Sequence, residues 1–379
     1  MTTDRPRARD FGIDLRGTPG QLNAITDVAG VEVGYATLVH GDGALTVGGG
    51  PVRTGVTAIF PRGRGGVGRP CAAGRFSLNG NGEMTGSAWI DEVGEIALPI
   101  TVSNTHAIGA CHTGVIEWIN ANHPALARQW LLPVCAETWD GYLNDINGGH
   151  VTPTVVGRAL DAARGGALAE GSVGGGTGMN CYGFKGGSGT SSRLVRFGAT
   201  TYTVGVFMQA NFGSRDELTV NGRPLGRLLD VENPMENSDW FQRDLRAPAG
   251  AGSCITIVAT DAPLSAAQCA GLARRVPLGL ARTGTTGSLF SGDIFLAFST
   301  GNDGPSQTGF ADDESALELH ATQHLPWNRI DPLYAAVVYA VEEAVLNALL
   351  VNETMVGRDG HISPALPHDQ LRALLPQEP

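Results

Sequence analysis

The pair Gly252-Ser253 constrains this sequence more than any other feature. It ends a polar, structure-poor stretch that runs roughly from residue 221 to 252, and it opens a sharp apolar run at 254–260. A serine at the first position of a buried strand, directly after Ala-Gly-Ala-Gly, is typical of an internal processing site. Cleavage there would give Ser253 a hydroxyl nucleophile and a free α-amine. An α-amine titrates near pH ~8, so it can serve as the base for the hydroxyl without a histidine relay.

Composition restricts the class of protein. The 379 residues are 42% hydrophobic and 17% charged, which is enough apolar surface for a large folded core. The net charge is −11 and no Lys/Arg-rich block occurs, so we expect neither a nucleic-acid partner nor an anionic membrane. The apolar stretch 334–351 contains Glu342 and Glu343, which favours a buried helix over a membrane span.

Two further features predict a cytoplasmic protein. The six cysteines are scattered without a C-x-x-C pair, which is typical of reduced, buried thiols. The first ten residues are charged and have no apolar segment of the kind that a secretory signal carries.

Strands and helices are predicted in mixed order along the chain. Apolar runs predict strands at 56–60, 131–136, 202–209, 254–260 and 294–298. Helical spacing predicts helices at 106–121, 152–164, 265–283 and 331–351. Thr152 is the expected N-cap of the second helix, and Pro277 should break the third. Without clean βαβ repeats, this order favours a layered α/β fold with mixed sheets.

The remaining segments are predicted to be less regular. A hairpin is expected around Ala29-Gly30, and residues 1–20 should lie over the surface. Residues 301–328 are expected to form a loop, and 358–379 a weakly structured tail with one short helix near Gln370.

Glycine-rich and histidine-rich segments do not carry a cofactor signal. The runs 174–178 and 183–190 lack the G-x-x-x-x-G-K-[ST] order, and neither opens a helix, so we interpret them as hairpin-like loops packed against other backbone. His320 and His324 are four apart but have no H-E-x-x-H arrangement. We therefore expect no metal and no cofactor.

Three segments could build a site around Ser253. Ser291 and Asp293 precede the strand at 294–298, and they would lie beside Ser253 if that strand pairs with 254–260. The segment 75–86 is either a turn-rich loop or a substrate-binding wall in which Glu83 could hold an ammonium group. The segment 137–145 is either an ordinary strand exit or part of the site, since strand ends often carry functional residues.

These segments together resemble the L-aminopeptidase/D-esterase (DmpA-type) family of self-processing N-terminal serine hydrolases, which includes the β-peptidyl aminopeptidases. The likeness extends over nearly the whole chain, in the segments NAITDV at 23–28, GNGEMTG at 80–86, NTH at 104–106, LNDIN at 143–147, GGGTGM at 174–179, QAN at 209–211, ATDAPL at 259–264, LARRVP at 272–277 and SGDIFLAFST at 291–300.

The resemblance implies one α/β domain over residues 1–379, a four-layer αββα sandwich of two mixed sheets between helical layers. It implies cleavage between Gly252 and Ser253, into an α chain of residues 1–252 and a β chain of residues 253–379. Residues 222–252 would form a flexible segment before the cleavage site. The two chains are expected to stay together and to assemble as tetramers of αβ units.

The resemblance also implies roles for particular residues. Ser253 would be the nucleophile, Ser291 and Asp293 its supporting hydroxyl and carboxylate, and Asn211 a side-chain donor of the oxyanion hole. The family's second donor is a tyrosine in an E-T-Y-D-G segment, and here that position is Trp139. An indole N–H donates one hydrogen bond with a different reach, and the nearby Tyr142 is a second candidate for the role.

The expected function is hydrolysis of small peptides, amino-acid amides or esters with a free amino end, with Asp293 or Glu83 as the partner of the substrate amine. Two alternatives stay open at this point. The same fold serves acyltransferases of the ornithine acetyltransferase type and polyamide-oligomer hydrolases, and a decayed site would leave a binding protein.

Overall fold

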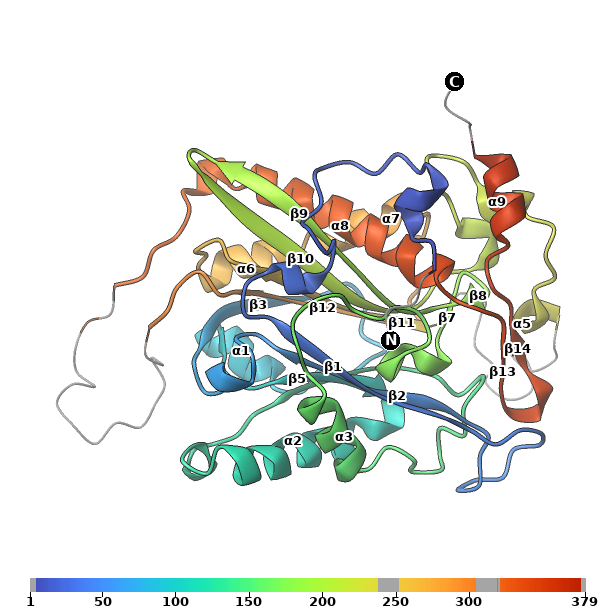
Figure 1. Cartoon of the computed structure of the whole chain (residues 1–379), viewed down its shortest axis with the longest axis horizontal. Coiled ribbons are helices and arrows are strands. Elements are labelled where there is room, and N and C mark those ends of the chain that lie inside the picture. Colours follow the sequence, from blue (N-terminus) through green and yellow to red (C-terminus); the bar gives the residue numbers. More distant parts are fainter. Residues whose placement is uncertain (1–4, 238–251, 305–318, 320, 376–379) are drawn as a thin grey trace.

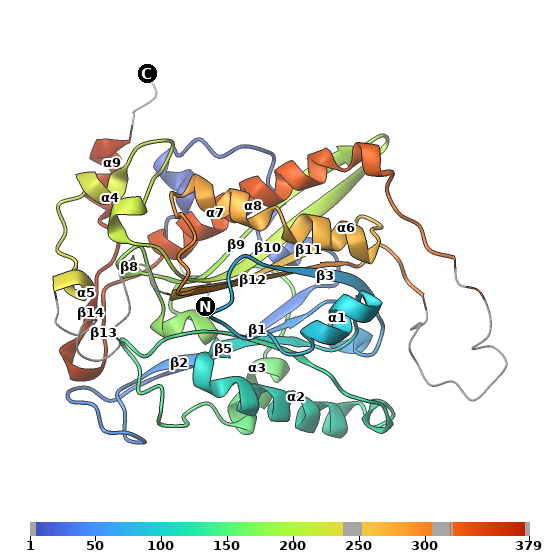
Figure 2. The ribbon, with the colours of Figure 1, turned by 180° about the vertical axis from the view of Figure 1, so that it is seen from behind.

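Two β-sheets packed face to face between helical layers form the body of the protein (Figures 1 and 2). The computed structural model describes residues 5–237, 252–304, 319 and 321–375. The smaller sheet has the order β1-β2-β5-β6, formed by β1 (Glu32–His40), β2 (Val52–Phe60), β5 (Ile100–Asn104) and β6 (Val134–Thr138). The larger sheet has the order β4-β3-β12-β11-β10-β9, formed by β4 (Glu95–Ile96), β3 (Cys71–Ser77), β12 (Ser291–Ser299), β11 (Gly252–Thr260), β10 (Thr200–Asn211) and β9 (Gly187–Phe197).

Both sheets are mixed. In the smaller sheet β5 and β6 are parallel, and in the larger sheet β11 and β12 are parallel, whereas the other pairs are antiparallel. Side chains of Ile59, Val102, Phe207, Ile257 and Leu296 fill the space between the sheets. This confirms the layered α/β fold that the residue patterns predict and the αββα sandwich that the family resemblance implies.

Helices cover the outer face of each sheet. On the smaller sheet lie α2 (Ile108–Asn122) and α3 (Pro153–Asp161), and on the larger sheet lie α6 (Ala266–Ala273), α7 (Val276–Arg282) and α8 (Asp331–Leu350) (Figure 1). The shorter elements are α1 (Ser87–Val93), α4 (Leu225–Leu228), α5 (Pro234–Asn237), α9 (His368–Leu374), β7 (Asn180–Cys181), β8 (Phe184–Lys185), β13 (Met355–Val356) and β14 (Ile362–Ser363).

Helix α8 packs on β9 and β10 of the larger sheet. Its length and composition would allow it to span a membrane, but 78% of its apolar stretch is buried inside the protein. Glu342 and Glu343 lie within it and both are buried. This confirms the prediction of a buried helix.

Local signals at helix ends are confirmed. The Thr152 hydroxyl accepts a hydrogen bond from Val155 N at 3.4 Å, as an N-cap does. The predicted long helix at 265–283 is two helices, because α6 ends at Ala273 and α7 begins at Val276 with Pro277 in its first turn.

The hairpin predicted around Ala29-Gly30 is wrong. Residues 25–27 form one 3-10 turn rather than a strand, and β1 pairs instead with β2 in a longer hairpin. The run 183–190 belongs to a hairpin, as predicted, but it consists of β8 and the start of β9 rather than a loop. Gly174–Gly178 forms a buried 3-10 turn that packs on β2. This agrees with the prediction that the run packs tightly against other backbone.

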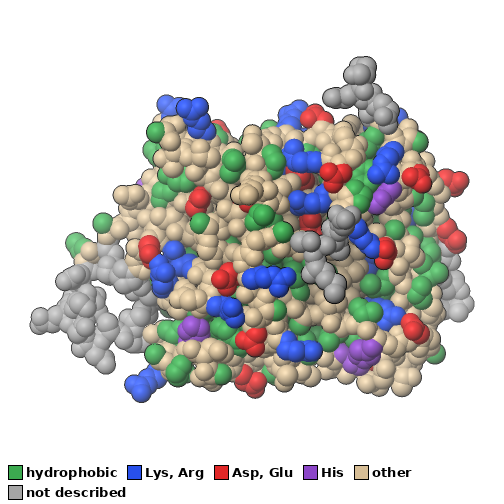
Figure 3. All heavy atoms as spheres, in the orientation of Figure 1, with side chains coloured by type: hydrophobic (Ala, Val, Ile, Leu, Met, Phe, Trp, Pro, Cys, Tyr) green, Lys and Arg blue, Asp and Glu red, His purple; other side chains and the backbone are tan. Residues whose placement is uncertain are grey.

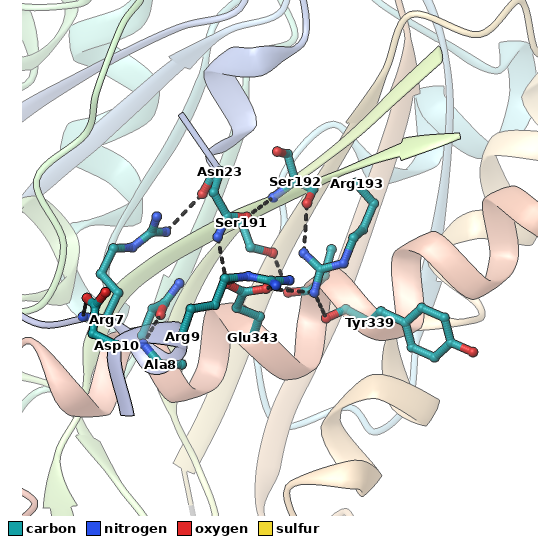
Figure 4. Close-up of polar contacts among 12 residues, drawn as sticks. Arg7, Ala8, Arg9, Asp10, Asn23, Ser191, Ser192, Arg193, Tyr339 and Glu343 are labelled. Atoms are coloured by element: carbon teal, nitrogen blue, oxygen red, sulfur yellow. Dashed lines mark hydrogen bonds and ion pairs between the residues drawn. The ribbon is translucent and has the colours of Figure 1, made fainter. Parts of the chain in front are cut away.

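The two ends of the chain are more ordered than predicted. Ala8 and Phe11 enter the core, and Arg9 reaches the buried carboxylate of Glu343 on α8 (Figure 4). At the other end Leu371 of α9 is buried in the same cluster. Of the segment 222–252, residues 222–237 contain α4 and α5, and 238–251 lie outside the described residues. Most of the predicted loop at 301–328 also lies outside them.

Candidate active site

Three neighbouring strands bring the predicted residues together at one edge of the larger sheet. In the antiparallel pair β10–β11, Asn211 lies opposite Ser253. In the parallel pair β11–β12, Ser253 lies opposite Gly292, between Ser291 and Asp293. The side chains of Ser253, Ser291 and Asp293 are all buried, and only 2% of Ser253 is exposed. The pairing that would place Ser291 and Asp293 near Ser253 is therefore present.

Gly252 occupies a position where only glycine fits. A Cβ on this residue would lie 2.0 Å from the backbone oxygen of Asn211. The N–H of Gly252 donates to Phe290 O at 3.3 Å. The backbone on the amino side of Ser253 is thus held close to β10 and β12.

The loop after β6 contacts the Ser253 hydroxyl. Trp139 N donates to Ser253 Oγ at 3.3 Å, and Asn211 Nδ2 donates to Trp139 O at 2.9 Å. The hydrogen bond from Trp139 to Ser253 thus runs through the backbone N–H. The indole packs on the following turn, since a Cβ on Gly141 would lie 2.4 Å from its Cζ2 atom.

The Asp293 carboxylate is held on both oxygens. Ser291 Oγ donates to Asp293 Oδ1 at 2.6 Å, and Asn79 Nδ2 donates to Oδ2 at 2.8 Å. Burial raises the pKa of Asp293, and the hydrogen bonds from Ser291 and Asn79 oppose that rise.

A second buried carboxylate, Glu137, was not among the predicted residues. Its Oε1 accepts from Glu83 N at 2.9 Å, and the Thr105 hydroxyl donates to Oε2. A Cβ on Gly82 would lie 3.0 Å from Gly292 Cα and 3.3 Å from Glu137 Oε1, which places Glu137 beside the strand that neighbours Ser253. Burial raises the pKa of Glu137. The sequence feature that could have identified Glu137 is its position as a carboxylate at the end of an apolar strand, two residues before Trp139.

The other two predicted residues lie differently. The Glu83 side chain is exposed, although its backbone N–H holds Glu137. Tyr142 is buried, its hydroxyl donates to Ile362 O at 3.1 Å, and its ring stacks on His361 with centroids 4.7 Å apart. Burial raises the pKa of Tyr142 to about 12.

Within the described residues no three His, Cys, Asp or Glu side chains gather in a way that could hold a metal ion. On the face in Figure 3, Lys/Arg and Asp/Glu side chains are scattered and no large area of one sign is visible.

Comparisons with known proteins identify relatives over the full length. The model of the peptidase family S58 matches residues 23–363. The chain is 44% identical to the beta-peptidyl aminopeptidase BapA of Sphingosinicella microcystinivorans, over 99% of this chain and 93% of that protein.

Solved structures agree with this result. The L-aminopeptidase D-Ala-esterase/amidase of Ochrobactrum anthropi, described as a prototype of the serine aminopeptidases and a new variant of the Ntn hydrolase fold, superposes with a TM-score of 0.88. It is 42% identical over 97% of this chain and 98% of that one. A Burkholderia sp. beta-aminopeptidase superposes with a TM-score of 0.84, at 42% identity over 97% of each chain.

Family, relatives and fold therefore agree on an aminopeptidase that uses an N-terminal serine nucleophile, and the chain belongs to peptidase family S58.

Proposed function

We propose that the protein cuts its own chain between Gly252 and Ser253 and that the new terminus, Ser253, is the nucleophile of the mature aminopeptidase. The observation that supports this best is the register of β10, β11 and β12, in which the buried Ser253 lies opposite Asn211 on one side and opposite Gly292, between Ser291 and Asp293, on the other. In the first step Ser253 Oγ attacks the Gly252 carbonyl carbon, and the C–N bond breaks as the ester forms. Water then hydrolyses the ester and frees the α-amine.

The close backbone approach at Gly252 fits such a step, because a residue with a Cβ could not place its carbonyl there. After cleavage the β chain would stay bound, since β11 lies between β10 of the α chain and β12. Residues 1–252 and 253–379 would then function as one unit.

In turnover the α-amine of Ser253 accepts the proton of its own hydroxyl while Oγ attacks the acyl carbon of the substrate. Ser291 and Asp293 orient the amine. The donors that we propose for the oxyanion are the N–H of Trp139, which donates to Ser253 Oγ, and Asn211 Nδ2, which donates to Trp139 O. The protonated amine then passes its proton to the leaving amine, and water releases the acyl group.

For the substrate's amino group we propose Glu137, whose buried carboxylate lies beside Gly82 and Gly292. Glu83 stays a weaker candidate because its side chain is exposed. The relatives at 44% identity are beta-peptidyl aminopeptidases, so we propose short peptides with an amino-terminal β-residue as substrates, beside amino-acid amides and esters. The comparisons do not favour the acyltransferase, oligomer-hydrolase or decayed-site alternatives.

We further propose a homotetramer of αβ units in the cytoplasm. Support for the compartment comes from the six cysteines, all of which are buried and unpaired, as in proteins of reducing compartments.

Mass spectrometry of the purified protein tests the proposal. We expect two fragments that meet at the Gly252–Ser253 bond, and turnover of aminoacyl p-nitroanilides or β-dipeptides. Ser253→Ala should give one intact chain without activity, whereas Ser87→Ala at the start of α1 should behave as wild type. An uncut wild-type chain with full activity would overturn the proposal.

A further inference from the structure

Lys185 is the only lysine in the protein. Lysine and arginine together number 26, and every one except Lys185 is an arginine. Lys185 is also fully buried, with 0% of its surface exposed. A lysine at this one position, in a chain that otherwise uses arginine, indicates a requirement that a guanidinium does not meet.

The hairpin that carries Lys185 is rigidly held. It consists of β7 and β8, joined by Tyr182 and Gly183 with φ of 53° and 64°. The Arg215 guanidinium donates to Tyr182 O at 3.0 Å and to Gly183 O at 2.5 Å, and it lies 3.6 Å from the centre of the Phe184 ring. The position of the Lys185 backbone is therefore fixed from outside the active site.

The Lys185 ammonium binds backbone carbonyls instead of a carboxylate. Nζ donates to Met179 O at 2.8 Å and to Gly186 O at 2.7 Å. Among the ion pairs within 4.0 Å of the described residues, none includes Lys185. Burial lowers the pKa of Lys185 to about 7, and the charge of Asp140 opposes that fall.

The carbonyl of Met179 belongs to the same peptide group as the N–H of Asn180. That N–H donates to Asn211 Oδ1 at 2.8 Å. On its other side, Asn211 Nδ2 faces the loop over Ser253 and donates to Trp139 O at 2.9 Å. A single peptide group thus joins the Lys185 ammonium to the amide that we propose as oxyanion donor. Hydrogen bonds in such a chain polarise one another in a low dielectric.

Each of the two carbonyls accepts a hydrogen bond from another donor besides Lys185. Met179 O also accepts from Gly186 N at 3.0 Å, and Gly186 O also accepts from Asn352 Nδ2 at 2.8 Å. Removing the ammonium would leave neither carbonyl without a donor, so a purely structural role gives no reason to bury a charge here.

We propose that Lys185 is a positioning residue of the active site: through the Met179–Asn180 peptide it fixes the Asn211 amide with Nδ2 toward Ser253 and strengthens that N–H as a hydrogen-bond donor to the oxyanion. This inference rests on the proposed role of Asn211. The ammonium is a compact group with three donors, and two of them bind the carbonyls of Met179 and Gly186.

A double-mutant cycle on the processed enzyme tests the proposal. Lys185→Met should lower kcat about tenfold with little change in KM, because it weakens an oxyanion donor whose full removal costs ~10²–10³-fold. Lys185→Gln, which keeps a neutral donor, should lose less. In an Asn211→Ala background, Lys185→Met should change kcat less than about twofold. Equal losses in both backgrounds would overturn the proposal.

Asn352→Leu is the matched control. It removes another buried donor to Gly186 O without touching the Met179–Asn180 peptide. It should lower the melting temperature but leave kcat of the folded enzyme unchanged. A loss of kcat like that of Lys185→Met would assign the effect to general disturbance of the hairpin.

One measurement needs no substitution of Lys185 and no activity. Because the chain has one lysine, protein labelled with ¹³C,¹⁵N-lysine gives one ε signal. The comparison uses the uncut Ser253→Ala protein. Adding Asn211→Ala to it should shift the lysine signal, whereas adding Asn81→Ala, at an exposed residue, should not. An unmoved signal would overturn the link even if cleavage and turnover occur, and a shift would support it even if they do not.

Discussion

Two buried clusters of charge in this protein are built in opposite ways. Around Glu343, the carboxylate receives Arg9 at 2.9 Å, Arg193 at 2.7 Å and Asn23 at 2.6 Å, and the chain's amino-terminal segment is tied to α8 and β9 (Figure 4). Burial raises the pKa of Glu343, but the hydrogen bonds and charges of Arg9 and Arg193 outweigh burial and leave the pKa below its ordinary value. Every charge there has an opposite partner.

Behind the proposed oxyanion donors the pattern is reversed. Lys185 binds carbonyls, and Asp140 binds Asn144 at 3.0 Å through Oδ1 while its buried Oδ2 has no hydrogen-bond partner. Burial raises the pKa of Asp140 to about 7, against the hydrogen bonds of Thr54 and Asn144. The first cluster thus pairs its charges directly, whereas in the second, burial shifts the pKa of both Lys185 and Asp140 toward 7 and no ion pair within 4.0 Å of the described residues includes Lys185.

The largest expected effect comes from breaking the paired cluster. Glu343→Ala leaves two arginines without their carboxylate, one of them with only 1% of its side chain exposed, and should lower the free energy of unfolding by about 3–5 kcal/mol. Denaturant unfolding monitored by circular dichroism measures it. The folded fraction should keep the wild-type kcat.

Arg372→Ala is the control for that prediction. Its ion pair with Asp369 is exposed and 3.8 Å long, so the loss should stay within about 1 kcal/mol. Equal destabilisation by the two substitutions would show that the Glu343 cluster is no more important to folding than a surface pair.

A smaller effect is expected from pH, and it comes from Lys185. The pKa of Lys185 falls from 10.5 in the unfolded chain to about 7 in the folded protein. Between these pH values the unfolded chain holds a proton that the folded protein has released, so this group makes the free energy of unfolding rise with pH. Lys185→Met should remove that part of the slope between pH 7 and 10.

The single lysine signal reports the same equilibrium directly. In the labelled wild-type protein it should titrate with a midpoint near pH 7. A midpoint near 10 would show that Lys185 is solvated or ion-paired in solution, and the contrast with Glu343 would disappear.

Sequence patterns predicted the parts of the site that depend on neighbouring strands. Ser253 precedes one apolar run and Ser291-Gly292-Asp293 precedes another, which predicted that both lie at the same edge of a sheet. The parallel register of Ser253 and Gly292 brings them together. Gly252 came from the sequence pattern and Asn211 from the resemblance, and the close approach of their backbones explains why the first must be glycine.

The residues that sequence reasoning missed depend on long-range burial. Glu137 and Lys185 look like ordinary polar residues in the sequence. The importance of Glu137 appears only when a loop 54 residues upstream packs against it, and that of Lys185 only when its hairpin is buried in the fold. The ordered chain ends were missed for the same reason, because Arg9 meets its partner Glu343 across 334 residues. No local pattern encodes such contacts.

The smallest expected effect is the stability of Lys185→Met at pH 7. Burying an ammonium without an ion pair is costly, and both of its carbonyl partners keep other donors, so replacing it with an apolar side chain of similar length should change the free energy of unfolding by no more than about 1 kcal/mol. Denaturant unfolding of Lys185→Met and of Glu343→Ala under the same conditions compares a charge that folding does not need with a charge that it needs. A loss above about 3 kcal/mol would place Lys185 with the paired cluster, because a residue kept for catalysis alone gives no reason for so large a contribution to folding.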